Sequence, residues 1–343
     1  MVSAKGRKKL VLDSLAEEKT EEKKYEVIED IPGVGPATAE KLKQIGFQTI
    51  ESLATASIRE LELAGIGDKV AARVIQCARD GIAFTFITAA DLMKLRQTMK
   101  QLTTSSKTVD ELVAGGLETQ TITEFYGQYG VGKSIMCHQL AVNVQLPEEK
   151  GGLNGGALYI DTESTFRPEW IVRMAKARGL DPQEAAQRII YSEAYNSDHQ
   201  ILLLEKADKV IKENNIRLII VDSLTAHFRS EYLGREMLAS RQQKLNSHMH
   251  RLCRLARAFN AVAVVTNQVM AKPDAFFAMV VEPVGGNVVG HTSHTRVFFR
   301  RAGSGAVRIA RLVSSTHLPE GERLFKVTNN GIEDVSEKDE PRH

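Results

Sequence analysis

Cysteine is scarce in this sequence, and no apolar run is long. The three cysteines, Cys77, Cys137 and Cys253, form no CxxC pair and have no histidine pair nearby, which argues against a disulfide framework and a zinc site. No apolar run reaches the ~18 residues that a membrane span requires, and none of signal-peptide length follows the basic start. We therefore expect a soluble, intracellular, cytoplasmic protein with no membrane partner.

An excess of charge of one sign is also lacking. Lys and Arg total 45 and Asp and Glu total 43, so the formal net charge is only +2. A charge this small gives no general attraction to nucleic acid, and any DNA binding must come from local placement of basic residues. The 343 residues suffice for one large core and a smaller second domain.

Composition divides the chain into segments. The first 25 residues alternate Lys-rich and Glu-rich patches and carry little apolar surface, so they predict a disordered tail, with a basic arm on phosphates as the alternative. The following segments are expected to be a small helical domain, a linker, a large α/β core and a polar tail, at 26–80, 81–100, 101–335 and 336–343.

Two Gly-x-Gly turns in the helical domain resemble each other. Ile31-Pro-Gly-Val-Gly35 and Ala64-Gly-Ile-Gly67 each precede a helix-like stretch. The free backbone N–H groups at such a helix start can hold a phosphate oxygen without reading bases. The repeat resembles the helix-hairpin-helix of DNA-binding proteins and predicts weak duplex binding; two plain helical turns are the alternative.

Short apolar segments alternate with amphipathic ones through the large core, which predicts a mostly parallel sheet covered by helices. The expected strands are 122–126, 157–160, 188–192, 218–221 and 261–266. Three further β-rich runs crowd near the end, at 296–300, 307–313 and 323–328, and predict antiparallel additions on one edge.

One motif after the first core strand carries specific chemistry. The sequence GQYGVGKS matches G-x-x-x-x-G-K-[ST], between a strand and an apolar helix, the context that identifies a phosphate loop. Backbone N–H groups would surround the β-phosphate, Lys133 would reach the β- and γ-oxygens, and Ser134 would ligate Mg²⁺. The candidate nucleotide-binding residues here are Gly127, Gln128, Tyr129, Gly130, Val131, Gly132, Lys133 and Ser134.

Polar residues end three other strands of the core. Asp222 ends an apolar strand and suits the carboxylate that holds Mg²⁺ through a bound water in phosphate-loop ATPases. Glu163 follows another strand and is the candidate general base, with Asp161 as its competitor. Gln268 follows a third strand, where its amide could sense the γ-phosphate and pass that change to the Gly-containing loop after it.

These strand ends, in this order, resemble the RecA-like DNA strand-exchange recombinases, and among them the archaeal RadA group. The resemblance covers nearly the whole chain and includes 122–125, 161–163, 165–169, 266–269 and 317–322. It implies a RecA-like phosphate-loop ATPase core with a twisted, mostly parallel sheet behind a small all-α domain. It also implies a DNA-dependent ATPase that uses ATP and Mg²⁺ and forms filaments on single-stranded DNA for homologous pairing and recombinational repair.

The resemblance further implies contacts between subunits. Phe86-Ile-Thr-Ala89 resembles the family's polymerisation motif, in which Phe enters a pocket on the next subunit and Ala packs beside it; a buried linker Phe is the alternative. His291 and Pro319 are implied to contact ATP held by the adjacent subunit. The expected assembly is a helical homo-oligomer, with a ring as an alternative resting state.

Two segments resemble the family's DNA-facing loops. The first is expected to neutralise the DNA backbone and stack on bases through Arg229, Tyr232, Arg235 and Arg241, although a solvated charged face is the alternative. The second, at 270–290, ends in Gly285, Gly286 and Asn287. Both single- and double-stranded DNA are expected partners.

Three departures from the family pattern affect these expectations. The second loop is apolar around 276–283, and Ser314 replaces an Asp of a segment that binds monovalent cations in some members. Trp170 stands where an Arg often covers adenine, so its indole is expected to stack on adenine, with packing against the core as the alternative.

Two other classes compete with a recombinase. A ring-shaped motor on the same fold would normally carry an arginine finger and has no need of Phe86-x-x-Ala89. A paralogue acting as a mediator would have weak ATPase activity, whereas Lys133 and Glu163 are intact here. The helical domain, which such paralogues often lack, also favours a recombinase.

Overall fold

The computed structural model describes residues 25–44, 47, 49–63, 65–81, 87–234, 236–271, 281–303 and 305–336. The tails predicted at 1–25 and 336–343, apart from Tyr25 and Ser336, lie outside these residues, as do Phe86, Arg235 and the middle of the second loop. The chain divides into two compact units, Met1–Thr98 and Met99–His343.

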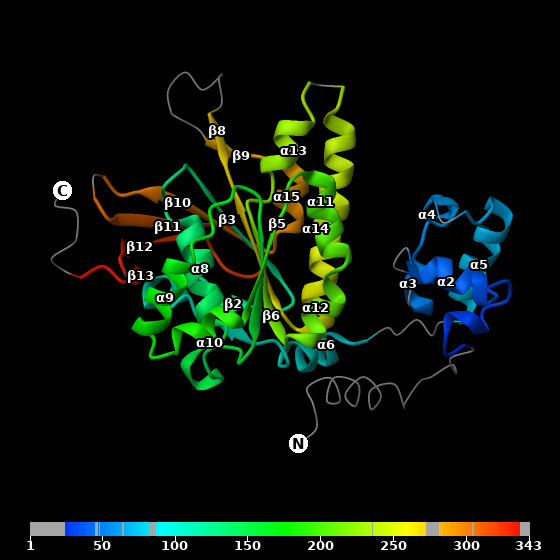
Figure 1. The fold of residues 1–343 in the computed structure, drawn as a ribbon, viewed down its shortest axis with the longest axis horizontal. Coiled ribbons are helices and arrows are strands. Elements are labelled where there is room, and N and C mark those ends of the chain that lie inside the picture. The colour runs from blue at the N-terminus through cyan, green and yellow to red at the C-terminus, as the bar shows by residue number, and fades with distance from the viewer. Residues whose placement is uncertain are drawn as a thin grey trace. The chain divides into compact units, whose positions relative to one another are not determined.

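The first unit is helical and has its own apolar core (Figure 1). Along its longest helix, Ala71, Val74, Ile75 and Ala78 are buried at intervals of three and four residues, so one face packs against neighbouring helices. The helices are η1 (Ile28–Asp30), α2 (Pro36–Gln44), α3 (Ile50–Ala54), α4 (Ile58–Leu63), α5 (Asp68–Gly81) and α6 (Ala89–Arg96). The helix that begins at Ala89 ends at Arg96, after which the chain turns.

The second unit is built on a nine-stranded sheet within the described ranges, in the order β13-β12-β11-β10-β3-β7-β6-β4-β5. Its strands are β3 (Ile122–Gly127), β4 (Gly156–Asp161), β5 (Ile189–Glu193), β6 (Ile216–Asp222), β7 (Val262–Asn267), β10 (Thr295–Arg301), β11 (Val307–Ser315), β12 (Gly321–Thr328) and β13 (Gly331–Glu333). The strands from β5 to β10 pair in parallel, and β10 to β13 pair antiparallel on one edge. Both features confirm the sequence prediction, except that β10, expected among the antiparallel additions, pairs in parallel with β3.

Five short strands were not predicted. Besides β13, they are β1 (Gln101–Leu102) paired with β2 (Leu117–Glu118), and β8 (Val269–Ala271) paired with β9 (Val281–Pro283). Two or three residues are too few for an alternating pattern to be recognised in the sequence.

Helices cover both faces of the sheet. In Figure 1, α8, α9 and α10 lie on one side and α11, α12 and α14 on the other. The helices of this unit are α7 (Lys107–Leu112), α8 (Lys133–Asn143), η2 (Glu148–Lys150), α9 (Pro168–Ala177), α10 (Pro182–Gln187), α11 (Ser197–Glu205), α12 (Ala207–Glu213), α13 (Ala226–Glu231), α14 (Leu238–Phe259) and α15 (Gly286–Thr292). This cover explains why the central strands are continuous apolar runs.

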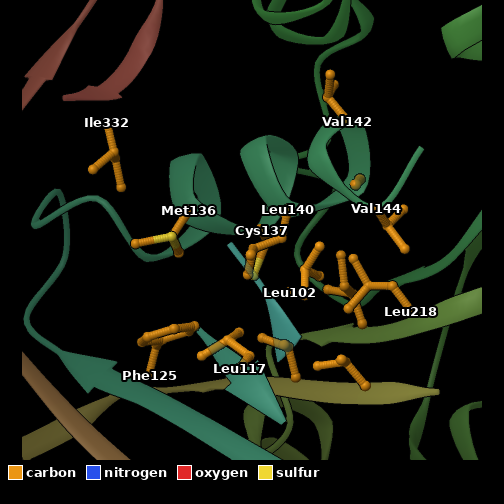
Figure 2. Close-up of a cluster of buried hydrophobic side chains, with 14 of the residues drawn as sticks. Leu102, Leu117, Phe125, Met136, Cys137, Leu140, Val142, Val144, Leu218 and Ile332 are labelled. Atoms are coloured by element: carbon orange, nitrogen blue, oxygen red, sulfur yellow. The ribbon is translucent and has the colours of Figure 1, made fainter. Parts of the chain in front are cut away.

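Alternate residues of each strand face the two covered sides. On β4, Ala157 and Tyr159 belong to one apolar cluster, and Leu158 and Ile160 belong to the other. Figure 2 shows the first cluster, where Met136, Cys137 and Leu140 of α8 point toward the strands that carry Phe125 and Leu218. Fully burying each such large side chain contributes about 1.5–3 kcal/mol. This packing fixes α8, and with it the loop that precedes α8.

The carboxyl ends of the parallel strands meet at one edge of the sheet. Asp161 lies opposite Asp222 in the register of β4 and β6, and Tyr126 lies opposite Asn267 in that of β3 and β7. In open α/β sheets this edge is where ligands bind. The polar residues that the sequence places at strand ends are therefore brought together here.

Candidate nucleotide site and DNA-facing loops

The phosphate loop is shaped by glycines that no other residue could replace without strain. A Cβ at Gly127 would lie 2.3 Å from the carbonyl oxygen of Phe299 on the neighbouring strand β10. Gly132, the residue before α8, has φ of +106°, in the left-handed region that favours glycine. The loop therefore runs close to β10 and turns directly into the start of α8.

Lys133 is the first residue of α8 and extends back over the loop. Its Nζ donates to the carbonyl oxygens of Gly127 and Gln128, both at 2.9 Å. Burial lowers the pKa of Lys133, while the negative charges of Asp222 and Glu163 raise it. A partly desolvated ammonium group at this position is suited to an anionic ligand.

A cavity of about 480 Å³ lies along this edge of the sheet. Its walls include the phosphate loop together with side chains from the neighbouring strand ends, Glu163, Asp222 and Gln268. The other predicted residues that line it are Gly127, Gln128, Tyr129, Gly130, Gly132, Lys133, Ser134 and Trp170. Val131 is buried in the first core cluster instead, so its side chain anchors the loop.

Glu163 and Gln268 are in direct contact. The Glu163 Oε1 atom accepts hydrogen bonds from Gln268 Nε2 and from the Ser223 hydroxyl, both at 2.7 Å. Neither bond uses Oε2, so this second oxygen can accept a proton from a water molecule. The candidate general base is thus oriented by Gln268, two residues before the segment 270–290 that resembles the second DNA-facing loop.

Asp161, the competing candidate, has a different environment. Its side chain is fully buried and accepts hydrogen bonds from the backbone N–H groups of Glu163 at 3.0 Å and Phe166 at 2.8 Å. These bonds fold the segment after β4 back on itself. The arrangement favours Glu163 for the chemistry and gives Asp161 the task of shaping the segment that carries it.

Ser134 and Asp222 line the same cavity and fit a magnesium ion. Asp222 is 4% exposed and accepts hydrogen bonds from the hydroxyl groups of Tyr159, at 2.6 Å, and Thr266. These bonds orient the carboxylate at the cavity wall. A hydroxyl and a carboxylate are the hard oxygen donors that Mg²⁺ prefers when phosphates complete its coordination.

The sequence did not single out Ser223 or His138, which also line the cavity. Ser223 directly follows Asp222, and this position beside a predicted site residue was the sequence signal that could have identified it. His138 accepts from the backbone N–H of Arg167 at its Nε2 atom, 3.0 Å away, so Nδ1 carries the proton and donates to the Ser134 carbonyl. Burial lowers the pKa of His138 and favours this neutral form. The ring thereby ties α8 to the segment that bears Glu163.

Trp170 lies in the first turn of α9 and is half-buried. It packs against the first core cluster and also lines the cavity, so both environments considered for it are present. The guanidinium of Arg173, one turn later, lies 4.1 Å from the centre of the indole ring. This cation–π contact fixes the ring plane and brings a positive charge beside it.

The first DNA-facing segment runs from α13 into α14. Arg229 is exposed, whereas Arg241 is half-buried and its Nε atom has no hydrogen-bond partner within the described ranges. Tyr232 packs against the second core cluster, with Phe228 at 6.5 Å between ring centres and the Lys244 ammonium 5.3 Å from its ring. Tyr232 is therefore less free to stack on a base than the sequence suggested.

The second DNA-facing segment ends at α15. Gly285 and Gly286 have positive φ values, and Asn287 is exposed. A Cβ at Gly285 would lie 3.3 Å from Leu245 of α14 and 3.4 Å from Thr225 before α13. Gly285 therefore packs against the residues that flank the first segment, Thr225 before it and Leu245 after it.

Comparison with known proteins identifies the family. A family model described as Rad51 matches residues 95–335, and one described as a SAM-like helix-hairpin-helix tandem matches residues 25–80. The chain belongs to the Rad51 family. It is 50% identical over 308 residues to the DNA repair and recombination protein RadA of Aeropyrum pernix, covering 90% of this chain and 96% of that protein. It is 48% identical over 325 residues to the RadA of Metallosphaera sedula, covering 94% and 100% respectively.

In this Rad51-family chain, His291 and Pro319 lie outside the phosphate-loop cavity. His291 is on α15 and lines a separate cavity of about 540 Å³ with His250, His294 and Arg257. Pro319 is exposed on the connection between β11 and β12. Neither residue reaches the nucleotide position of its own subunit, so any contact with ATP would be with another subunit's.

The two Gly-x-Gly turns of the family's helical unit are alike in backbone but differ in charge. The carbonyls of Gly35 and Gly67 each accept the first helical hydrogen bond, at 2.9 Å from Ala39 and Ala71. The first turn of α2 has no acidic residue, whereas α5 begins at Asp68, which raises the pKa of the nearby Glu62. A phosphate is therefore favoured at the first turn and opposed at the second.

Within the described part of the chain, no helix is long and apolar enough to cross a membrane.

Proposed function

We propose that this chain hydrolyses ATP at the phosphate-loop cavity and uses ATP to assemble on single-stranded DNA as a strand-exchanging filament. Its relatives are DNA repair and recombination proteins, and the chain is a recombinase of that type. The observation that carries the ATP-linked part of the proposal is the 2.7 Å contact between Glu163 and Gln268. It joins the candidate general base to Gln268, which lies two residues before the second DNA-facing segment at 270–290.

Hydrolysis requires a bound phosphate chain, an oriented water and a base. Lys133 would exchange its contacts with backbone carbonyls for the β- and γ-oxygens, and Ser134 and Asp222 would hold Mg²⁺. Bound there, Mg²⁺ neutralises charge on the phosphates. Glu163 Oε2 would then accept the proton of the water that attacks the γ-phosphate, while Gln268 and Ser223 keep Oε1 in place.

The nucleotide state would reach DNA through Gln268. Its side chain contacts Glu163, and its carbonyl accepts from the backbone N–H of Val284 at 2.9 Å, at the far end of the same loop. An amide that exchanges a γ-phosphate for water on hydrolysis would move both ends of the loop. ATP would therefore favour one loop arrangement and ADP another.

Assembly would use the edge of the sheet. β5 is an edge strand, and Tyr191 on it is 42% exposed. Such an edge can receive an extended segment from another chain, as the motif Phe86-x-x-Ala89 requires. Ala89 is exposed at the start of α6, while Phe86 lies outside the described residues. His291 lies outside the phosphate-loop cavity of its own subunit, which supports a position for ATP at the junction of two subunits.

DNA would be held by its backbone and tested by its bases. Arg229 and Arg241 would neutralise phosphates of the single strand, and the first turn of the helical unit would hold duplex. Because these contacts leave base edges free, Watson–Crick pairing itself would select the homologous partner.

The proposal predicts that Gln268→Ala binds ATP but loses most of the stimulation of its ATPase by single-stranded DNA. Phosphate release measured with and without an oligonucleotide tests this, with Gln183→Ala of α10, an exposed amide far along the chain from the cavity, as the control. Stimulation of the Gln268 variant equal to that of the control would refute the role of Gln268.

A further inference from the structure

A charged and fully buried group lies beneath the cavity, where β3, β7 and β10 meet. Glu124, in the middle of β3, has no exposed surface, and its Oε2 accepts from Arg296 Nε of β10 at 2.7 Å. The side chain of Arg296 is itself 16% exposed. A buried carboxylate is costly unless it is paired and hydrogen-bonded, so its position between two parallel strands calls for a reason.

The other oxygen of Glu124 holds Asn267, the last residue of β7, which is also fully buried. The amide nitrogen of Asn267 donates to Glu124 Oε1 at 2.8 Å and to the Val284 carbonyl at 2.6 Å. Its amide oxygen accepts from the Thr225 hydroxyl at 2.7 Å and from the Gln268 backbone at 2.9 Å. Every donor and acceptor of this amide is used.

These partners permit only one orientation of the Asn267 amide. A flipped amide would set its oxygen against the Glu124 carboxylate and the Val284 carbonyl, and its nitrogen against the Gln268 N–H. The Glu124 carboxylate therefore selects the orientation, and Arg296 holds that carboxylate in place.

The partners of Asn267 belong to several functional segments or flank them. Gln268 holds the candidate base and lies two residues before the second DNA-facing segment, and Val284 lies near the end of that segment. Thr225 directly precedes α13, which leads into the first DNA-facing segment. Glu124 lies three residues before Gly127 on the strand that delivers the phosphate loop.

Arg296 extends the same network to α15. A Cβ at Gly290 would lie 3.2 Å from its guanidinium, and Gly290 is the neighbour of His291. One buried unit thus contacts the strand before the phosphate loop, Val284 of the second DNA-facing segment, the residue Thr225 shortly before the first one, and the helix that carries His291.

We propose that Asn267, oriented by Glu124, is a positioning residue that couples the nucleotide cavity to both DNA-facing segments. The inference rests on the proposed function, because it takes these segments as the ones that bind DNA. A displacement of Gln268 strains the bonds from the same amide to Val284 and Thr225, so the three groups change arrangement together. Coupling of this kind is reciprocal: ATP raises the affinity for DNA by the factor by which DNA raises the affinity for ATP.

The test measures that factor in the full-length protein. Affinity for a fluorescent poly-dT oligonucleotide is measured by anisotropy with and without a non-hydrolysable ATP analogue, and affinity for the analogue with and without the oligonucleotide. Thr225→Val replaces the hydroxyl with a methyl group of similar size. Glu124→Gln leaves a single carbonyl oxygen for the two donors on opposite sides of the side chain, Arg296 and Asn267. In both variants the two factors should fall equally, by about 2- to 30-fold, while affinity for the analogue without DNA stays close to that of the wild type.

Thr104→Val is the matched control. Thr104 is also fully buried and donates its hydroxyl to a carboxylate, that of Asp110, at 2.6 Å, outside both DNA-facing segments. It should lose stability, as Thr225→Val does, but keep the wild-type coupling factor. Thr225→Ser, which retains the hydroxyl, should also keep it.

The two ideas fail differently. The wild type is expected to couple ATP binding to DNA binding. If it does so, and Thr225→Val and Glu124→Gln show the same coupling factor as Thr104→Val, the proposed role of Asn267 is wrong and the proposed function survives. If the wild type binds no oligonucleotide with or without the analogue, the proposed function is wrong, and the proposed role of Asn267 is refuted with it.

Discussion

At the scale of single residues, the proposed hydrolysis depends on the free oxygen of Glu163. The oxygen that accepts from Ser223 and Gln268 holds the side chain in place, and the other is available to water. The neighbouring Asp161 is occupied by two backbone N–H groups. In the proposed mechanism, Glu163 therefore carries out the chemistry and Asp161 supports the segment that holds it.

We predict that Glu163→Gln binds ATP and DNA but turns ATP over about 10²–10⁴ times more slowly, because an amide cannot accept the proton of the attacking water. Steady-state phosphate release, together with ATP affinity, measures this. Glu169→Gln, an equivalent change at an exposed carboxylate in the first turn of α9, should be near normal. Near-normal turnover in Glu163→Gln would assign the role to another residue.

Trp170 is the one tryptophan of the chain, so its fluorescence reports directly on the cavity. If its ring stacks on adenine, ATP should quench or shift the emission. Trp170→Ala should then weaken ATP binding by about 1–3 kcal/mol, the value of one stacked base. Inorganic triphosphate, which has no base, should bind the variant and the wild type alike. Emission that ignores saturating ATP, with unchanged affinity in the variant, would leave only the packing role.

At the scale of elements, the strands and the phosphate loop could be predicted from the sequence, and the buried contacts between them could not. Ile122–Gly127 is a fully buried strand followed by a specific motif, and the sequence displays that motif directly. The bond between Asn267 and Glu124 joins residues 143 positions apart and depends on the strand order. Only the folded sheet brings them together.

The same limit applied to the side chains of the first DNA-facing segment. Its arginines and Tyr232 were expected from their spacing, but their exposure depends on how α13 and α14 pack. In the structure, Arg229 is exposed, Arg241 is half-buried and Tyr232 packs against Phe228. Trp170 likewise makes a cation–π contact with Arg173. The family resemblance, in which an Arg often stands at the position of Trp170, did not suggest this contact.

We predict that replacing Arg229, Arg235 and Arg241 together with Ala weakens single-strand binding on all sequences alike. The slope of log affinity against log salt should flatten by about 0.7 for each lost phosphate contact. Titrations of a fluorescent oligonucleotide at several salt concentrations measure the slope. Replacing Arg188, Lys209 and Lys212, three exposed basic residues outside both DNA-facing segments, removes the same charge and should leave the slope largely intact. Equal slopes in the two variants would mean that Arg229, Arg235 and Arg241 form a solvated face and do not contact phosphates.

At the scale of the whole molecule, two features of the structure support the proposed assembly of several subunits. The candidate ATP cavity contains neither His291 nor Pro319, and β5 is an edge strand of the sheet. In the proposed function, subunits would complete each other at these places. The helical unit would add a duplex contact at its first turn, where the start of α2 carries no acidic residue.

The most direct test of the central claim is a strand-exchange assay with the wild type and with Phe86→Ala. The wild type, with ATP and Mg²⁺, should transfer a strand from homologous duplex to single-stranded DNA, and should not do so without ATP. Phe86→Ala, which lacks the proposed subunit anchor, should elute as a monomer at micromolar concentration, bind ATP and exchange no strands. A wild type that binds both DNAs and ATP but forms no exchanged product, or a Phe86 variant that exchanges as well as the wild type, would contradict the account.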